Sequence, residues 1–315
     1  MDRVFLTGGS GFIGSHLAEA LLAKGHEVTI YDVKKPENNK ARYIQGDIMD
    51  YRLLKSSMRG HKTVCHLAAM VGVVACLSDE KEVYRINYDG VKNIINACKK
   101  VGAENLLFTS SSEVYGEGGG FRQLEENMEL SPITHYGKSK MYSEQLLKEF
   151  SEESGIKVTV LRYCNIYGSR QRKEFVISIF LDRLLQGKPI KICGDGEQIR
   201  CFTYIDDAVE GTIKALFRKE REFDIFNIGS NQTVKINELA MKIIELNRSG
   251  EVKYVSFEDL NRRSECEILI RVPSIEKAEN KLGHTPLMTL DEGLAITYDY
   301  YRNIKGKEPV IAAMG

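Results

Sequence analysis

The first 168 residues alternate between short apolar runs and amphipathic segments, and this order constrains the fold more than any other feature of the chain. Apolar runs typical of buried strands occur at 3–7, 27–32, 41–47, 62–69, 103–112 and 157–165. Apolar residues at helical spacing occur at 11–25, 80–101 and 135–154. Strands joined by helices through short connections form parallel sheets with helices on both faces. The pattern therefore predicts an α/β, Rossmann-like doubly wound sheet.

Beyond residue 168 the alternation loosens, although strand and helix patterns continue. The sequence predicts short strands at 189–193, 224–229 and 252–256 and a final helix at 290–304. No linker rich in proline or serine separates this region from the first. We therefore expect a dinucleotide-binding domain at 1–168 and a smaller α/β lobe at 169–315, interleaved through strands or helices that return to the first sheet.

Charge and composition exclude several classes of partner. The 44 basic and 44 acidic residues cancel, so no overall field attracts nucleic acid or an anionic membrane. Seven cysteines without a CxxC pair are typical of reduced thiols, so we expect a cytoplasmic protein. The chain enters a strand at once, without room for a signal peptide, and no apolar run reaches the roughly 20 residues of a membrane helix. No metal is expected, and His66 is interpreted as structural because no ligand lies at metal spacing from it.

A glycine-rich loop follows the first predicted strand. The motif TGGSGFIG places Gly8, Gly11 and Gly14 around Phe12 and Ile13, where the first helix begins. Glycines allow a tight turn and a close approach of the backbone to a pyrophosphate, which the helix N-terminus can bind. A tight structural turn would also explain a lone glycine triplet. Its position between a strand and a helix favours a dinucleotide site.

Asp32 ends the second predicted strand and supports the same interpretation. A carboxylate at this position can accept both hydroxyls of the adenosine ribose and would repel a 2′-phosphate, so NAD is favoured over NADP. Lys34 and Lys35 weaken this preference somewhat, although solvated charges are the simpler explanation for them. We therefore expect NAD as the cofactor.

Tyr136 and Lys140 lie four residues apart on a predicted helix, and therefore on one face of it. A nearby ammonium group and a cationic nicotinamide would both favour the phenolate form of the tyrosine. Tyr136 could then take the proton from a substrate alcohol while a hydride leaves the same carbon. YxxxK alone is a common surface pattern. Together with the glycine loop and Asp32, it predicts a catalytic pair.

Motifs in a recognisable order run nearly from end to end of the chain: TGGSGFIG, YD, GDI, HLAA, SSSEVYG, YGKSK, RYCNIYG, GDGEQIRCFTYIDD and RVPSIEKAENKLG. In this order they resemble the extended short-chain dehydrogenase/reductases. Within these, the chain is similar to the NAD-dependent epimerase/dehydratase group that modifies nucleotide sugars. The resemblance implies an enzyme that acts on a nucleotide-diphosphate sugar, bound by the C-terminal lobe.

The resemblance implies a role for each motif residue. Tyr136 would be the base, Lys140 would hold the nicotinamide ribose, and Ser111 would hydrogen-bond the sugar hydroxyl that is oxidised. The other cofactor contacts would be Asp47 and Ile48 at the adenine, Leu67, Ala68 and Ala69 along the groove, and Tyr163 by the nicotinamide. The other substrate contacts would be Asn165, Arg200 and Arg271 at the diphosphate, and Lys191 and Ile192 at the base. Guanidinium groups suit a diphosphate, although Arg200 alone would be read as a surface ion pair.

Glu113 is the position at which the reactions of this family diverge. Members share the transfer of a hydride from a sugar carbon, usually C4, to NAD, which leaves a 4-keto sugar. One large subgroup of dehydratases then uses Thr-Asp-Glu, where this chain has Ser111, Ser112 and Glu113. The missing Asp argues against that mechanism. Glu113 could be an acid/base at C5 or only a polar residue at a strand end.

We therefore expect an NDP-sugar 4-epimerase as the simplest outcome, with a 4-dehydrogenase, an NDP-uronate decarboxylase or a 4,6-dehydratase as alternatives. A decarboxylase would need a cation for the substrate carboxylate, and Arg172 and Lys173 are candidates. A non-catalytic dinucleotide-sensing protein is a remote alternative, because such proteins commonly lose the Tyr or Lys that this chain retains. The resemblance also implies a homodimer, in which the helices near 80–101 and 135–154 form a four-helix interface.

Overall fold

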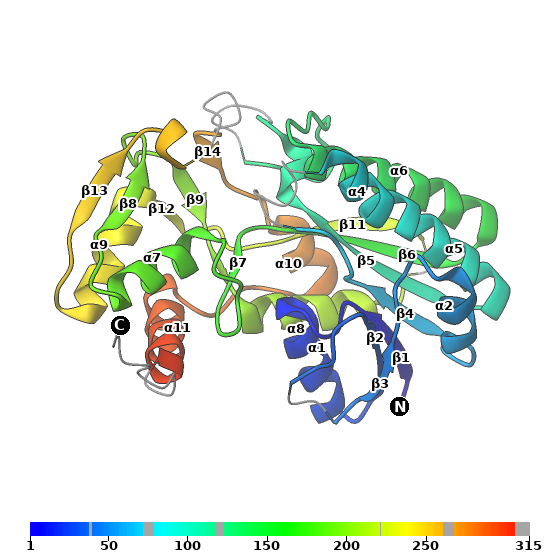
Figure 1. Ribbon diagram of the computed structural model, residues 1–315. Coiled ribbons are helices and arrows are strands. Elements are labelled where there is room, and N and C mark those ends of the chain that lie inside the picture. The colour runs from blue at the N-terminus through cyan, green and yellow to red at the C-terminus, as the bar shows by residue number, and fades with distance from the viewer. Residues whose placement is uncertain (38–39, 72–78, 118–122, 221, 261–267, 306–315) are drawn as a thin grey trace.

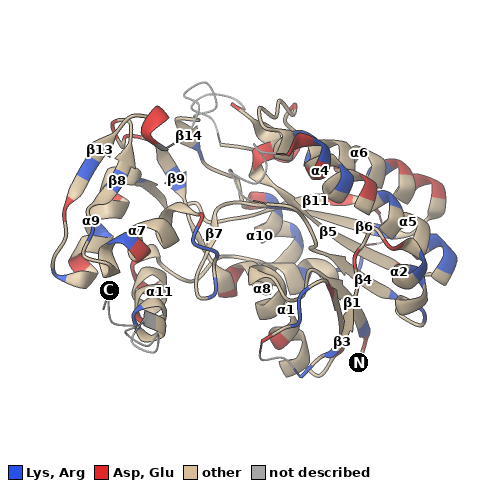
Figure 2. Ribbon diagram, viewed as in Figure 1, with Lys and Arg blue, Asp and Glu red and all other residues tan. Residues whose placement is uncertain are grey.

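The computed structural model describes residues 1–305 except 38–39, 72–78, 118–122, 221 and 261–267. A larger lobe is built around a seven-stranded parallel sheet, and a smaller lobe lies beside it (Figure 1). Basic and acidic residues are interspersed over both lobes (Figure 2). The fold class predicted from the sequence is confirmed.

The central sheet has the strand order β11-β6-β5-β4-β1-β2-β3. Its strands are β1 (Arg3–Thr7), β2 (Glu27–Asp32), β3 (Arg42–Gln45), β4 (Thr63–His66), β5 (Asn105–Ser111), β6 (Lys157–Tyr163) and β11 (Asp224–Ile228). Because β1 lies between β2 and β4, the strand order changes direction there. Open α/β sheets bind ligands beyond the carboxyl ends of their strands at such a point.

Helices cover both faces of the sheet (Figure 1). One face carries α1 (Phe12–Ala23), α8 (Ile205–Leu216) and α10 (Glu276–Leu282). The other carries α2 (Tyr51–Ser57), α4 (Glu80–Tyr84), the π-helical turn η1 (Arg85–Asp89), α5 (Gly90–Val101) and α6 (His135–Ser154). Side chains alternate along a strand, so Val4 and Leu6 of β1 belong to the first core and Phe5 belongs to the second.

In the part of the chain that the structure describes, the smaller lobe contains short sheets and three helices. Its paired strands are β7 (Ile166–Tyr167) with β10 (Thr203–Tyr204), β8 (Ile190–Cys193) with β13 (Val252–Val255), and β9 (Ile199–Cys201) between β12 (Thr233–Lys235) and β14 (Ile270–Arg271). Its helices are α7 (Val176–Leu185), α9 (Ile236–Asn247) and α11 (Leu290–Lys305). Two single 3-10 turns complete the described elements, η2 (Ser112–Tyr115) and η3 (Glu258–Leu260).

Segments of the second half of the chain lie in the larger lobe. β11 forms the sheet edge beside β6, and α10 covers it. Lys277 and Lys281 of α10 form ion pairs with Asp224 of β11 at 2.5 and 3.2 Å. The boundary of the two domains at residue 168 stays a prediction.

No helix among the described residues has the length and apolar character to cross a membrane.

Candidate active site

The turn after β1 forms a cradle of glycines. Gly8 has a φ of +72°, and the N–H of Gly11 donates to the carbonyl of Gly8 at 3.1 Å. A Cβ on Gly8 would lie 2.5 Å from the backbone nitrogen of Ala68, and one on Gly14 would collide with the Gly8 carbonyl. Only glycine therefore allows this close approach, which brings the unpaired N–H groups at the start of α1 to the carboxyl edge of the sheet. These donors fit a pyrophosphate.

Asp32 lies directly beside this turn. Its carboxylate accepts from the backbone N–H of Ser10 at 3.0 Å and from that of Lys34 at 3.0 Å. Two backbone donors thus fix the side chain at the end of β2, and an ionised carboxylate retains lone pairs for further acceptance. The position fits the adenosine ribose of a dinucleotide.

The other residues predicted to contact the cofactor lie along the same edge of the sheet. Leu67, Ala68 and Ala69 follow β4, and the N–H of Leu67 donates to the carbonyl of Thr7 at 3.1 Å. Asp47 follows β3, where its carboxylate accepts from the N–H of Met49 at 2.9 Å, and Ile48 is buried. Tyr163 ends β6, and its hydroxyl pairs with Thr212 of α8 at 2.7 Å. Burial raises the pKa of Tyr163, so its phenol stays neutral.

Lys140 ties α6, the helix that carries Tyr136, to β5. Its side chain is 2% exposed, and its ammonium donates to the carbonyl of Thr109 at 2.7 Å. The same nitrogen lies 4.6 Å from the ring centre of Phe108 and 5.9 Å from that of Tyr136. The cation therefore holds the first turns of α6 against the end of β5.

Ser111 is the last residue of β5 and the register partner of Tyr163 on β6. Its hydroxyl accepts from the N–H of Glu113 at 3.2 Å and so caps η2. Lys140 contacts Thr109, which lies two residues before Ser111 on β5. The structure therefore brings Tyr136, Lys140 and Ser111 to the same end of this strand. Their catalytic roles stay predictions.

His66 is the buried histidine next to this group. It is 2% exposed, and its Nδ1 pairs with the hydroxyl of Thr7 at 2.7 Å. Burial, and secondarily the charge of Lys140, lowers the pKa of His66 to about 3. The ring is therefore neutral at physiological pH and adds no charge to the site.

Arg200 and Arg271 are register partners on the parallel strands β9 and β14. Partners on adjacent parallel strands project to the same face, so the two guanidinium groups lie on one side of this small sheet. Figure 2 shows the basic segments on both strands. Arg200 donates to the carbonyls of Ile199 and Leu269 at 2.9 and 3.2 Å. Two adjacent guanidinium groups form an arrangement suited to a diphosphate.

An ion pair joins Arg271 to Glu113 across the two lobes, and sequence reasoning missed it. The Nη1 of Arg271 donates to the Oε1 of Glu113, and these side chains are 9% and 30% exposed. No local pattern signals a contact between residues 158 positions apart. The pair occupies an oxygen of the carboxylate that a C5 acid/base would need.

The other candidate substrate residues lie in the smaller lobe or at its border. Asn165 has a φ of +45°, and its side-chain amide donates to the carbonyl of Cys201 at 2.9 Å. Lys191 and Ile192 lie on β8, which pairs with β13. Arg172 pairs with Glu174 at 2.9 Å and Lys173 with Asp182 at 3.1 Å, both at the surface. The two candidate cations for a substrate carboxylate are thus engaged by acidic groups of the chain itself.

The model of one family, described as the NAD dependent epimerase/dehydratase family, matches residues 4–229. The chain belongs to this family. Its fold, its cofactor NAD and its nature as an enzyme, all predicted from the sequence, are thereby confirmed. The glycine cradle and Asp32 fit that cofactor.

Family members of known sequence or structure cover nearly the whole chain. A UDP-N-acetyl-alpha-D-glucosaminuronate decarboxylase of Bacillus cytotoxicus is 36% identical over 96% of this chain and 98% of the relative. A putative UDP-glucose 4-epimerase of Methanocaldococcus jannaschii is 34% identical over 95% of this chain and 98% of the relative. The crystal structure of a Thermotoga maritima UDP-glucose 4-epimerase with UDP-glucose superposes with a TM-score of 0.90 at 30% identity, covering 96% of this chain and 99% of that one. The family therefore includes epimerases, decarboxylases and dehydratases.

Proposed function

We propose that this enzyme oxidises a nucleotide-diphosphate sugar at C4 and acts as an NDP-sugar 4-epimerase. The observation that supports this proposal most is the position of Ser111 at the end of β5. Lys140 ties this strand end to the helix that carries Tyr136, so the hydroxyl and the tyrosine lie at the same end of β5. A hydroxyl and a tyrosine are sufficient for oxidation and reduction at C4, and epimerisation requires no group at C5.

Each step of such a reaction can be assigned to residues of this chain. NAD, which the glycine loop and Asp32 would hold, would supply the acceptor and donor of a hydride. Ser111 orients the C4 hydroxyl, and Tyr136 takes its proton while the C4 hydride leaves, which gives a 4-keto sugar. Arg200 and Arg271 hold the diphosphate while the 4-keto sugar rotates to present its other face. Tyr136 then gives the proton back to the C4 oxygen as the hydride returns to the opposite face.

An NDP-uronate decarboxylase is the second candidate, favoured by the 36% identical decarboxylase among the relatives. A 4-keto uronate is a β-keto acid, so it could lose CO₂ without a base at C5. Such a substrate requires a cation for its carboxylate, and Arg172 and Lys173 are paired with Glu174 and Asp182. A 4-epimerase of a neutral hexose requires no such cation, so the epimerase is the simpler proposal.

A panel of UDP-, GDP-, dTDP- and CDP-sugars, followed by NMR, tests the proposal. We expect a C4 epimer from at least one neutral hexose substrate. Loss of CO₂ from an NDP-uronate would identify the decarboxylase, loss of water a dehydratase, and accumulation of reduced cofactor a 4-dehydrogenase. No turnover of any sugar would contradict the proposal and favour a dinucleotide-sensing protein. Tyr136→Phe is the control, because it should reduce turnover by about 10³-fold or more and leave NAD bound.

We also propose a cytoplasmic homodimer. Tyr84, Tyr88 and Tyr142 form an aromatic group on α4, η1 and α6, with Tyr142 42% exposed. The ring centre of Tyr142 lies 6.4 Å from that of Tyr84 and 6.3 Å from that of Tyr88. Exposed aromatic residues are enriched at interfaces, which supports pairing of these helices with their copies. Light scattering at micromolar concentration should give the mass of a dimer, and a monomer would contradict it.

A further inference from the structure

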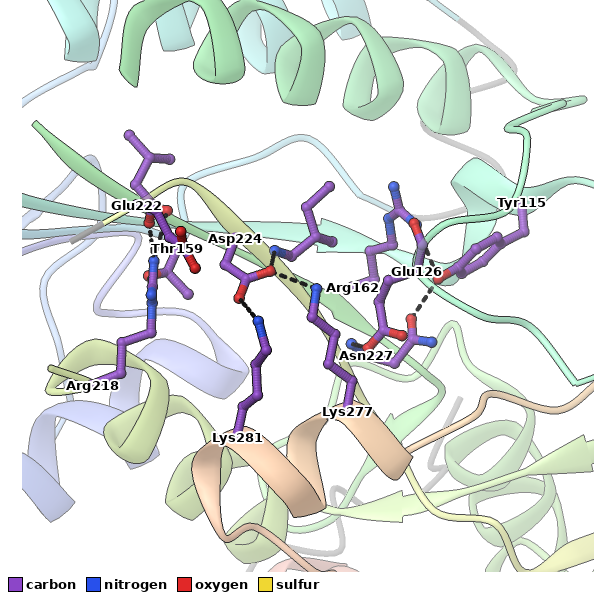
Figure 3. Close-up of polar contacts among 12 residues, drawn as sticks. Tyr115, Glu126, Thr159, Arg162, Arg218, Glu222, Asp224, Asn227, Lys277 and Lys281 are labelled. Atoms are coloured by element: carbon purple, nitrogen blue, oxygen red, sulfur yellow. Dashed lines mark hydrogen bonds and ion pairs between the residues drawn. The ribbon is translucent and has the colours of Figure 1, made fainter. Parts of the chain in front are cut away.

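A buried chain of polar contacts lies at the carboxyl half of β11 (Figure 3). Its central residue, Asn227, has no exposed surface. The side-chain nitrogen of Asn227 donates to the carbonyls of Leu124 and Ser274 at 2.8 and 3.1 Å. Its side-chain oxygen accepts from the hydroxyl of Tyr115 at 2.7 Å. One amide thus contacts three segments that are distant in the sequence.

Arg162 determines which way this amide points. Its Nη1 donates to the Tyr115 hydroxyl at 3.0 Å, and a guanidinium group has donors only. The Tyr115 oxygen must therefore accept from Arg162 and give its own hydrogen to Asn227. The amide nitrogen is left to face the two carbonyls.

Glu144 of α6 compensates the charge of Arg162. Glu144 pairs with Arg162 at 2.6 Å, and both side chains are buried. The Ser110 hydroxyl donates to the same carboxylate at 2.5 Å. Although burial opposes it, the bond to Glu144 raises the pKa of Arg162, so the cation persists. The orientation of Asn227 therefore depends on the helix that carries Tyr136.

Of the two carbonyls that accept from Asn227, that of Ser274 belongs to the segment that follows Arg271. The carbonyl of Leu124 belongs to a segment that pairs with it. The N–H of Leu124 donates to the carbonyl of Val272 at 2.8 Å, and the N–H of Ser274 donates to the carbonyl of Leu124 at 2.9 Å. These bonds join both segments, and Asn227 attaches the joined pair to β11. Arg271 lies three residues before Ser274, at the end of β14.

We propose that Asn227 is a positioning residue that sets the place of Arg271 over the end of β5. Through Ser274 and Leu124 it fixes the strand of Arg271 to the catalytic sheet, where the guanidinium group meets Glu113 and, with substrate bound, the diphosphate. This inference rests on the proposed function, since it assumes that Arg271 binds the diphosphate. Removing the amide donors should loosen Arg271 without touching the groups that transfer hydride and proton.

A double-mutant cycle with Arg271→Ala tests the proposal. Asn227→Asp keeps the acceptor for Tyr115 and removes both amide donors, so we expect the KM for the nucleotide sugar to rise about tenfold with kcat within about twofold. In the Arg271→Ala background the same change should alter KM by less than about twofold, because coupled residues are not additive. Tyr115→Phe, which removes the hydroxyl between Arg162 and the amide, should also raise KM, and this effect should likewise disappear without Arg271. It serves as the test if Asn227→Asp does not fold.

Two results would overturn the proposal. One is an unchanged KM in the folded variants, and the other is an equal rise in KM with and without Arg271, since both assign Asn227 to the stability of the fold alone. Failure of the proposed function is recognised separately, as an absence of turnover in the unmodified enzyme. In that case hydrogen exchange decides: peptides covering 270–275 should exchange at least about tenfold faster in Asn227→Asp, while peptides of β6 keep their rates. Equal exchange at 270–275 would contradict the proposal.

Discussion

Arg271 of the smaller lobe donates to the carboxylate of Glu113, two residues beyond the last residue of β5. The resemblance assigns one group to the diphosphate and leaves the other open between C5 chemistry and a structural role. In the structure the two groups neutralise each other. A diphosphate that binds Arg271 would compete with this carboxylate. When no substrate is present, Glu113 compensates the charge of the buried guanidinium group.

Replacing Glu113 with Gln should leave turnover within about tenfold of the unmodified enzyme, because epimerisation at C4 needs no base at C5. NMR in D₂O should show no deuterium at C5 of the product. A loss of about 10³-fold or more in kcat, with C5 exchange in the unmodified enzyme, would assign Glu113 to acid/base chemistry.

Replacing Asp32 with Asn should reduce the preference for NAD over NADP by about tenfold or more, since the negative charge that repels a 2′-phosphate is removed. The measurement is the dissociation constant of each cofactor. Lys34→Ala is the matched control, because it keeps the backbone N–H that contacts Asp32, removes a positive charge instead of a negative one, and should therefore not reduce the preference for NAD. An unchanged preference in Asp32→Asn would contradict the assignment of the ribose site.

Arg162 and Glu144 form a buried ion pair, and removing either charge alone should destabilise the fold. Glu144→Gln should lower the free energy of unfolding by about 3–5 kcal/mol, because it leaves a buried guanidinium group uncompensated. Replacing both residues together with Met should cost less than the sum of the single changes. Urea unfolding measures each variant. Additive effects would show that the two side chains do not act as a pair.

His66 makes the stability of the fold depend on pH. Its pKa in the folded protein is about 3, below the ordinary value of 6.5, so the unfolded chain binds the proton more tightly. Stability is thus full above pH 6.5 and falls as the pH decreases toward 3, by about 1.4 kcal/mol per pH unit from this group. His66→Gln should remove this part of the slope in urea unfolding between pH 6 and pH 4. A variant with the slope of the unmodified protein would contradict the burial of a neutral ring.

Much of the fold could be predicted because hydrophobic periodicity is local. β1 (Arg3–Thr7), β2 (Glu27–Asp32) and α6 (His135–Ser154) have the bounds that their patterns predict. Other elements differ from their predicted bounds at the ends. β4 stops at His66 although the sequence stays apolar through Leu67, Ala68 and Ala69, and β3 stops at Gln45, before Gly46 and Asp47. The segment predicted as one helix at 80–101 contains a π-helical turn, which no spacing signals.

The candidate site was predictable only where short motifs carry it. The glycine loop, Tyr136 and Lys140 each depend on spacings of a few residues. The contact of Arg271 with Glu113 and that of Asn227 with Ser274 depend on segments 158 and 47 residues apart, which only the assembled fold brings together. Arg162 did offer a signal, since an arginine inside the apolar run VTVLRY needs a buried partner.

Transfer of label from C4 tests the central claim most directly. The sugar of the panel that the enzyme accepts is prepared with deuterium at C4, incubated with enzyme and NAD in H₂O, and followed by NMR. We predict a C4 epimer that retains deuterium at C4 and its original hydrogen at C5. Deuterium lost from C4, or a product that has lost CO₂ or water, would contradict 4-epimerisation by Tyr136 and Ser111.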